Sequence, residues 1–278
     1  MTKQEWIRVS TLTMVVALWS ASAPPAGAGP LVYVTGMANE FGTLDLTTGA
    51  FSQIAILNLP AGDAIFGMGY GADGKLYGVD SQSDANLWQI NPANGALTNL
   101  GAMGYSALDA TSDASGKLYV ISQDDAAIYY TVNPPSPAPT VVSPSGINSE
   151  GLMAINADGT ELFTTTLSKT GSTFNLISVN PTTGAATTLG DTGFKVDAGL
   201  FVGSTLFGFD TTRDTIVSLN TMTGAGTQVG TYELPNGDPI FAAAAVSEPS
   251  SLVLGLIGTA LAVSVCLIRH HRLAPEPR

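Results

Sequence analysis

Between residues 29 and 249 the sequence contains no cysteine and no histidine. The single cysteine, Cys266, and both histidines, His270 and His271, lie near the C-terminal end. Their absence from the middle of the chain excludes disulfides, Ser-His and Cys-His nucleophile pairs, and zinc sites built from His or Cys. A glycine-rich phosphate loop followed by lysine is missing as well. The site chemistry that remains uses carboxylates alone, as in calcium binding or paired-acid cleavage of glycosidic bonds.

Basic side chains are scarce in the same region. Residues 29–249 carry five Lys or Arg against twenty Asp or Glu, a formal charge of −15, compared with −12 for the whole chain. Such a surface repels nucleic acid and anionic lipid headgroups, and it favours cations or uncharged partners. A strongly acidic balance also serves simply to keep a domain soluble. The composition therefore predicts no nucleic-acid partner, and it leaves cation binding and solubility as two interpretations.

One stretch of the sequence has the length and composition of a membrane span. Residues 252–268 are seventeen residues without a charge or a proline. As a helix they would be about 25 Å long, at the short end of what crosses a bilayer. Arg269 and Arg272 follow and would mark the cytoplasmic side as a basic stop-transfer cluster. We therefore predict a transmembrane helix at 252–268 that holds the chain in the inner membrane.

The first 28 residues have the features of a secretory signal peptide. Lys3 and Arg8 give a weakly basic start, residues 11–19 form a short apolar core, and Ala26-Gly27-Ala28 is a small-residue cleavage site. The apolar core is too short to span a bilayer. The sequence thus predicts three parts: a signal peptide at 1–28, an exported domain at 29–246, and a C-terminal segment at 247–278.

The C-terminal segment resembles the PEP-CTERM sorting signal of Gram-negative bacteria. The resemblance is carried by Ser247-Glu248-Pro249-Ser250, the apolar run and the Arg cluster, although Ser247 stands where the family usually has proline. It implies recognition by an exosortase, a membrane cysteine protease that cleaves near Glu248-Pro249, and a link to exopolysaccharide and biofilm. The same module has been labelled after an ice-binding protein, but these residues give no reason to expect ice binding. A plain C-terminal anchor is the alternative.

The middle of the chain is built from repeats. One phrase, of which Val179-Asn180-Pro181-Thr182-Thr183-Gly184 is a full copy, occurs five times. Its Asp or Asn positions lie 46, 42, 47 and 40 residues apart, at Asp45, Asn91, Asn133, Asn180 and Asn220. A second motif repeats with the same period. Its copies are Leu76-Tyr77, Leu118-Tyr119, Leu162-Phe163 and Leu206-Phe207, with a looser first copy at Val32-Tyr33. Two markers that repeat together at a period of about 44 residues indicate a repeat architecture.

Each repeat has the pattern of four short strands separated by tight turns. In the second repeat the strands are expected at 64–70, 75–79, 86–90 and 96–100, with Asp73-Gly74 and Asn94-Gly95 as turn pairs. This pattern predicts an all-β fold, a five-bladed β-propeller of four-stranded blades. The first repeat lacks its opening strand, so we expect residues 240–246 to pair beside residues 31–35 and close the ring. Six blades is the alternative, if one long loop hides a blade.

Acidic residues gather on one predicted face, formed by the second-to-third strand hairpins and the links between blades. Asp80 with Asp84, and Asp210 with Asp214, share a spacing across a hairpin that would let two carboxylates hold Ca²⁺. The alternative is that they are ordinary turn residues. The opposite face carries the repeated Asn turns, for which we expect a structural role. The second-strand aromatic residues are expected in the core between blades rather than as a sugar platform: Tyr77, Tyr119, Phe163 and Phe207.

These features favour a secreted, non-enzymatic protein of the cell surface or extracellular matrix. Its acidic loop face would bind exopolysaccharide or another surface protein. The alternative is a five-bladed glycoside hydrolase or lyase, which needs two carboxyl groups about 5–10 Å apart at the central channel. Three or more carboxylates at the channel mouth would favour the enzyme, and carboxylates spread around the rim would disfavour it. The fold alone does not decide between them.

Overall fold

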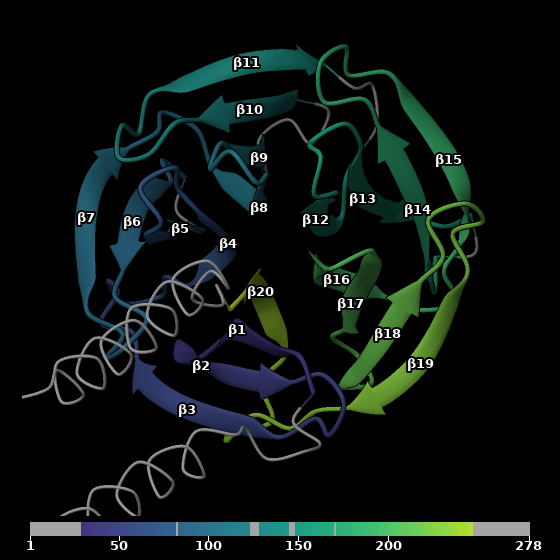
Figure 1. The fold of residues 1–278 in the computed structure, drawn as a ribbon, viewed down its shortest axis with the longest axis horizontal. Coiled ribbons are helices and arrows are strands. Elements are labelled where there is room, and N and C mark those ends of the chain that lie inside the picture. Colours follow the sequence, from purple (N-terminus) through teal and green to yellow (C-terminus); the bar gives the residue numbers. More distant parts are fainter. Residues whose placement is uncertain (1–28, 82, 123–127, 145–147, 170, 247–278) are drawn as a thin grey trace, which may run out of the picture. The chain divides into compact units, whose positions relative to one another are not determined.

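The computed structural model describes residues 29–81, 83–122, 128–144, 148–169 and 171–246, and all their regular secondary structure is β-strand (Figure 1). The described residues up to Ala245 belong to one compact unit. The predicted signal peptide, sorting motif, transmembrane helix and Arg cluster lie outside the described residues. Within the described part of the chain, no helix is long and apolar enough to cross a membrane.

Twenty strands form five antiparallel sheets of four, each running from the propeller axis to the rim (Figure 1). Blade 1 contains β20 (Ile240–Ala245), β1 (Leu31–Gly36), β2 (Glu40–Asp45) and β3 (Phe51–Ile56). Blade 2 contains β4 (Ile65–Tyr70), β5 (Leu76–Asp80), β6 (Asn86–Ile90) and β7 (Leu97–Ala102). Blade 3 contains β8 (Ala107–Ser112), β9 (Leu118–Ser122), β10 (Ile128–Val132) and β11 (Pro139–Pro144). Blade 4 contains β12 (Gly151–Ile155), β13 (Leu162–Leu167), β14 (Phe174–Val179) and β15 (Ala186–Asp191). Blade 5 contains β16 (Val196–Val202), β17 (Thr205–Asp210), β18 (Thr215–Leu219) and β19 (Gly226–Thr231).

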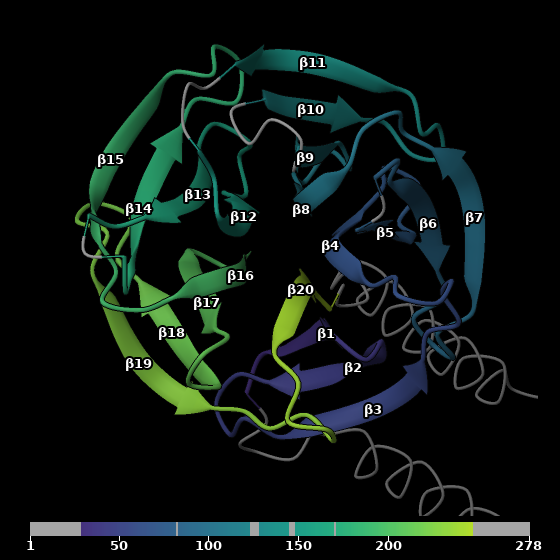
Figure 2. The same ribbon diagram turned by 180° about the vertical axis from the view of Figure 1, so that it is seen from behind.

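The last strand closes the ring as predicted. Strand β20 pairs antiparallel with β1, with Val32 opposite Ala245 and Thr35 opposite Ala242, and both views show the two strands side by side (Figures 1 and 2). The fully buried Glu40 accepts a 2.6 Å hydrogen bond from Asn236 Nδ2, which ties the β19–β20 link to blade 1. The prediction of five four-stranded blades is confirmed, and the six-bladed alternative is wrong because the loop after β10 supplies only β11.

The innermost strands approach one another closely because they are rich in glycine and alanine. A Cβ atom added to Gly67 on β4 would overlap the backbone nitrogen of Ala110 on β8 and lie 2.6 Å from its Cα. A Cβ atom at Gly151 on β12 would lie 2.7 Å from the carbonyl oxygen of Asp197 on β16. Larger side chains at these positions would push neighbouring blades apart, so small residues set the tight circumference of the ring.

The predicted core aromatics lie between blades. Tyr77 packs with blade 3 residues, Tyr119 with blade 4 residues and Phe163 with blade 5 residues, and all three are buried. Phe207 is half-buried against the cluster that joins blade 5 to blade 1. The repeated aromatic position therefore contributes to the packing of one blade on the next, as expected.

The repeated Asn phrase forms the turn between the third and fourth strands. Asn180 Oδ1 accepts hydrogen bonds from the backbone nitrogens of Thr182 and Thr183, both at 2.9 Å. The Gly184 backbone nitrogen donates to the Asn180 carbonyl at 2.9 Å, and Gly184 has a φ of +69°. This left-handed conformation is why glycine recurs at the end of the phrase. The same hydrogen bonds recur at Asp45 and Asn220, so the phrase is a structural turn.

We expect Asn180→Ala to lower the free energy of unfolding by about 1 kcal/mol, because two turn hydrogen bonds are lost at a solvent-exposed site. Thr182→Ala is the control, because Thr182 donates to Asn180 through its backbone and not its side chain. Urea denaturation of both variants measures the difference. Equal losses in the two variants would contradict the assignment of the turn to the Asn side chain.

Candidate functional site

The first predicted calcium pair is engaged in structural hydrogen bonds. Asp80, at the end of β5, is fully buried and accepts hydrogen bonds from Trp88 Nε1 at 2.7 Å and from the Asn86 backbone nitrogen at 2.8 Å. Asp84 is exposed and accepts a 2.7 Å hydrogen bond from the backbone nitrogen of Gly104. Asp80 therefore fastens β6 to the end of β5, whereas Asp84 holds the link that follows β7.

Replacing Asp80 by alanine should lower the free energy of unfolding by about 2–3 kcal/mol, because the indole N–H of Trp88 and a backbone N–H lose a buried acceptor. Asp84→Ala, in the same predicted pair, should lose less than about 1 kcal/mol because its hydrogen bond is exposed. Thermal unfolding with and without calcium measures both effects. A calcium-dependent rise in Tm that either variant abolishes would instead support the predicted metal site.

The second predicted pair has the same division of roles. Asp210, at the end of β17, is fully buried, and its Oδ1 accepts hydrogen bonds from the backbone nitrogens of Thr212 at 2.9 Å and Arg213 at 3.2 Å. The Arg213 guanidinium forms an ion pair with Asp210 at 3.4 Å. Asp214 is half-buried with a φ of +50°, and its carbonyl oxygen accepts a hydrogen bond from the Tyr232 backbone nitrogen.

No group of three or more His, Cys, Asp or Glu side chains placed to hold a metal occurs within the described ranges. Two further acids of the predicted face, Asp124 and Asp125, lie outside those ranges. Calcium binding by the two hairpin pairs stays a prediction.

A buried carboxyl group that the sequence did not single out lies on the innermost strand of blade 3. Asp109 is 3% exposed and accepts hydrogen bonds from the backbone nitrogens of Ala110 at 2.6 Å and of Met153, in blade 4, at 2.5 Å. It therefore joins two blades. An aspartate within the strand pattern of residues 107–112 was the available signal, because a charge at a buried strand position needs a specific partner.

Asp197 lies nearby in blade 5, where β16 has an irregularity in register between Val196 and Ala198. Its carboxylate accepts a hydrogen bond from the Thr211 hydroxyl. Burial raises the pKa of Asp197 to about 6, with Asp210 and Glu150 adding repulsion and Thr211 and Lys195 opposing the rise. Burial also raises the pKa of Asp109 well above its ordinary value, and the charge of Asp197 adds to it.

These two carboxyls should make the protein more stable in mild acid. Their pKa values are higher in the folded chain than the ordinary 3.8, so the folded state binds more protons as pH falls from neutral towards 4. At pH 7 the charged form of Asp197 destabilises the folded state by up to about 3 kcal/mol. This destabilisation disappears as the carboxyl is protonated between pH 7 and pH 4. Below this range the trend reverses, because hydrogen bonds from Thr48 and Thr160 lower the pKa values of Asp45 and Asp158 respectively.

Urea unfolding at pH 7 and pH 5 tests the expectation, with Asp197→Asn as the comparison. The variant keeps an acceptor for Thr211 but has no charge, so it should be more stable than the wild type at pH 7 and less sensitive to pH. An unchanged pH dependence in Asp197→Asn would contradict the assignment of the effect to this carboxyl.

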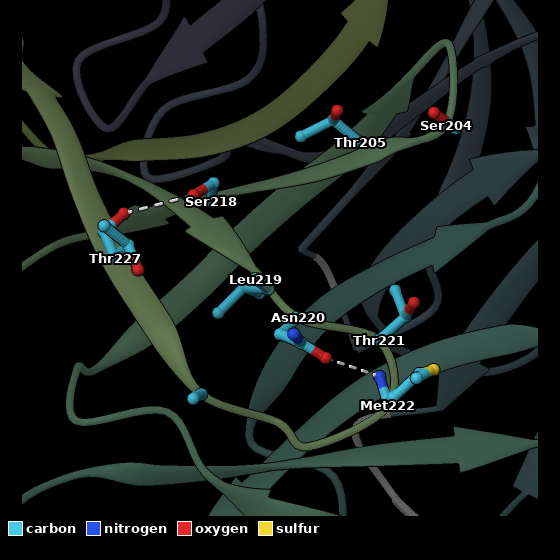
Figure 3. Close-up of a pocket in the computed structure, with 9 residues that line it drawn as sticks. Ser204, Thr205, Ser218, Leu219, Asn220, Thr221, Met222 and Thr227 are labelled. Atoms are coloured by element: carbon cyan, nitrogen blue, oxygen red, sulfur yellow. Dashed lines mark hydrogen bonds between the residues drawn. The ribbon is translucent and has the colours of Figure 1, made fainter.

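A pocket of about 420 Å³ opens on blade 5, on the face of the repeated Asn turns (Figure 3). Its walls come from the β16–β17 turn, β17, β18, the β18–β19 turn and β19. Five hydroxyl side chains and the 80% exposed Met222 are among the nine residues that line it. The hydroxyl residues are Ser204, Thr205, Ser218, Thr227 and Thr221, the last beside Met222 in the turn. The predicted acidic face is the opposite one, so the sequence analysis missed this pocket.

Comparison with known proteins agrees with the repeat and with the fold. Residues 67–204 match the model of a family described as "Repeat of unknown function (DUF6923)". No curated protein matches the chain. Among solved structures, a chain from the crystal structure of a nidogen/laminin complex superposes with a TM-score of 0.57 and 11% sequence identity, covering 79% of this chain and all of that one. At that identity the likeness concerns the fold alone. The chain is a five-bladed β-propeller repeat protein, and its central part matches a repeat family of unknown function.

Proposed function

We propose that the protein is an exported surface or matrix protein whose propeller binds exopolysaccharide or another surface protein. In this proposal residues 1–28 direct export, and residues 247–278 hold the chain in the inner membrane until an exosortase-like protease releases it to the cell surface or beyond. The support for sorting is the Ser247–Ser250 motif followed by the apolar run and the Arg cluster. The acidic charge of the exported region supports partners that are neutral or cationic.

The observation that carries binding over catalysis is the blade 5 pocket. None of the nine residues that line it has a titratable side chain, so it offers hydrogen bonds but no acid, base or ionised nucleophile. By contrast, the buried acids Asp80 and Asp210 already accept several hydrogen bonds each from neighbouring residues. A pocket of about 420 Å³ with several hydrogen-bonding groups is large enough to take a small ligand.

Binding is tested with the full-length chain purified in detergent and applied to a glycan array and to immobilised surface proteins of the source cells. We expect saturable binding to a polysaccharide or a surface protein. Absence of binding to both would overturn the proposed function.

Sorting is tested by co-expression with an exosortase-like protease, following the chain by cell fractionation. Glu248→Ala should leave the protein in the membrane, and the wild type should move to the surface or the medium. The basic-cluster variant Arg269→Ala with Arg272→Ala separates anchoring from cleavage, because it alters the stop-transfer residues and leaves the motif intact. Wild-type protein that stays in the membrane in the presence of the protease would contradict exosortase sorting.

The enzyme remains a second candidate because of Asp197. Its pKa of about 6 suits a general acid, and Glu150, which is exposed, acts on it electrostatically. Asp109 is too buried to touch a substrate. Incubation with polysaccharides should release reducing ends if this pair cleaves glycosidic bonds, and Asp197→Asn should abolish the release. No release from any polysaccharide that the chain binds would exclude the pair as a catalytic device.

A further inference from the structure

The same set of positions recurs on the second and third strands of every blade. Each second-strand aromatic lies opposite a polar residue of the third strand: Tyr33 with Thr43, Tyr77 with Gln89, Tyr119 with Thr131, Phe163 with Ser178, and Phe207 with Ser218. Two residues before the aromatic, at or just before the start of the second strand, lies a third residue of this set. We call it the groove residue, and in blades 1 to 5 it is Leu31, Lys75, Lys117, Glu161 and Thr205.

In blades 2 and 4 the groove residue reaches across to the third strand. Lys75 Nζ donates a hydrogen bond to Gln89 Oε1 at 3.3 Å. Ser178 donates from its hydroxyl to Glu161 Oε1 at 2.5 Å. In blade 3 Lys117 instead lies over the ring of Tyr119, with Nζ 5.5 Å from the centroid. In each of these three blades a long charged side chain therefore lies over the third strand or over the aromatic ring.

Blade 5 lacks this cover because Thr205 is short. The Ser218 hydroxyl donates instead to the carbonyl oxygen of Thr227 at 3.4 Å (Figure 3). Thr205 and Ser218, which stand at the positions of Glu161 and Ser178 in blade 4, both line the 420 Å³ pocket. Met222, in the adjoining turn, is the most exposed of the large apolar side chains in the described residues.

We infer that the blade 5 pocket binds one uncharged sugar unit of a polysaccharide chain, an inference that rests on the proposed binding function. The hydroxyl groups of Ser204, Thr205 and Ser218 both donate and accept hydrogen bonds, as sugar hydroxyls require. The exposed thioether of Met222 offers an apolar surface for the C–H face of the ring. The pocket volume falls within the range of small-ligand sites. An anionic sugar is disfavoured because the exported region carries a charge of −15.

The test uses the full-length chain in detergent with four probes: maltohexaose, cellohexaose, mannohexaose and oligogalacturonate. The wild type should bind at least one of the three neutral probes, at one site per chain by calorimetry. Thr205→Glu gives blade 5 the groove residue of blade 4 and should weaken that binding at least tenfold. Thr205→Ser keeps a short hydroxyl side chain and should change it less than threefold. Thermal unfolding checks that each variant keeps the wild-type fold.

Glu161→Thr is the matched variant in blade 4. It removes the side chain that bonds Ser178 and leaves blade 5 unchanged, so binding should persist and a second site should appear. Folded Thr205→Glu that binds a neutral probe like the wild type would overturn the pocket assignment while leaving the proposed polysaccharide binding intact. Binding of oligogalacturonate but of none of the neutral probes would overturn the inference that the pocket takes an uncharged sugar. A wild type that binds no probe but captures a surface protein would overturn the sugar site and leave the proposed surface role.

Discussion

A chain that stops at Asp238, before β20, is expected not to fold into the propeller. Without β20 the inner edge of blade 1 is open, and the buried side chains of Ile240 and Ala242 are lost from the core. Strand β20 also packs against β4 and β16, so both neighbouring blades lose their contact with blade 1 at the axis. We expect a loss of at least about 5 kcal/mol, comparable to the entire stability of many domains. Circular dichroism and urea unfolding of the truncated chain measure it.

A circular permutant provides the control. Val32 lies opposite Ala245 in an antiparallel pair, so a short linker can join the end of β20 to the start of β1 as a hairpin. A chain that begins shortly before Ile240 and continues through this linker should regain a cooperative unfolding transition. If the truncated chain unfolds as cooperatively as the full chain, ring closure by β20 does not stabilise the fold as described.

Gly67→Val should cost about 4 kcal/mol or more and can prevent folding altogether. Gly67 is on β4, where an added Cβ would overlap the backbone of Ala110 on the neighbouring innermost strand. The clash is with backbone and not with the end of a flexible side chain, so relief requires the two blades to separate. Expression yield and the midpoint of thermal unfolding report the effect.

Gly230→Val is the matched control, because Gly230 lies on the outermost strand β19 and an added Cβ would meet its nearest atom, of Ile216, at 3.6 Å. It should lose less than about 1 kcal/mol. Similar losses at the two positions would show that the close approach of the innermost strands is not what limits side-chain size.

The repeated residues made the fold predictable from sequence. The Asp or Asn turn, closed by glycine in four of the five blades, and the second-strand aromatic recur from blade to blade. Each acts through a local rule: a side-chain hydrogen bond to the next backbone nitrogens, or burial against the next blade. The missing opening strand of the first repeat and the surplus strand at 240–246 together predicted the ring closure. The third blade departs most from the repeated pattern, because its Asn133 motif lacks the closing Thr-Gly.

The site was much less predictable, because aspartates of the same spacing have different environments. Asp80 and Asp84 differ by four positions, yet one is fully buried against Trp88 and the other is exposed. Asp109 and Asp197 are 88 positions apart and interact only because blades 3 to 5 meet at the axis. The spacing of aspartates along the chain therefore does not predict which residues will surround each carboxyl group in the folded protein.

The sequence by itself determined the number of blades, the closing strand, the acidic charge and the absence of His and Cys from residues 29–249, because repeat period and composition are properties of the chain. Tertiary structure alone decided which carboxyls are buried and where the pocket opens. The groove residues Lys75, Glu161 and Thr205 differ in the sequence, but their effect depends on the third-strand residue that each faces. That pairing is set by strand register and blade packing, which bring together residues that are distant along the chain.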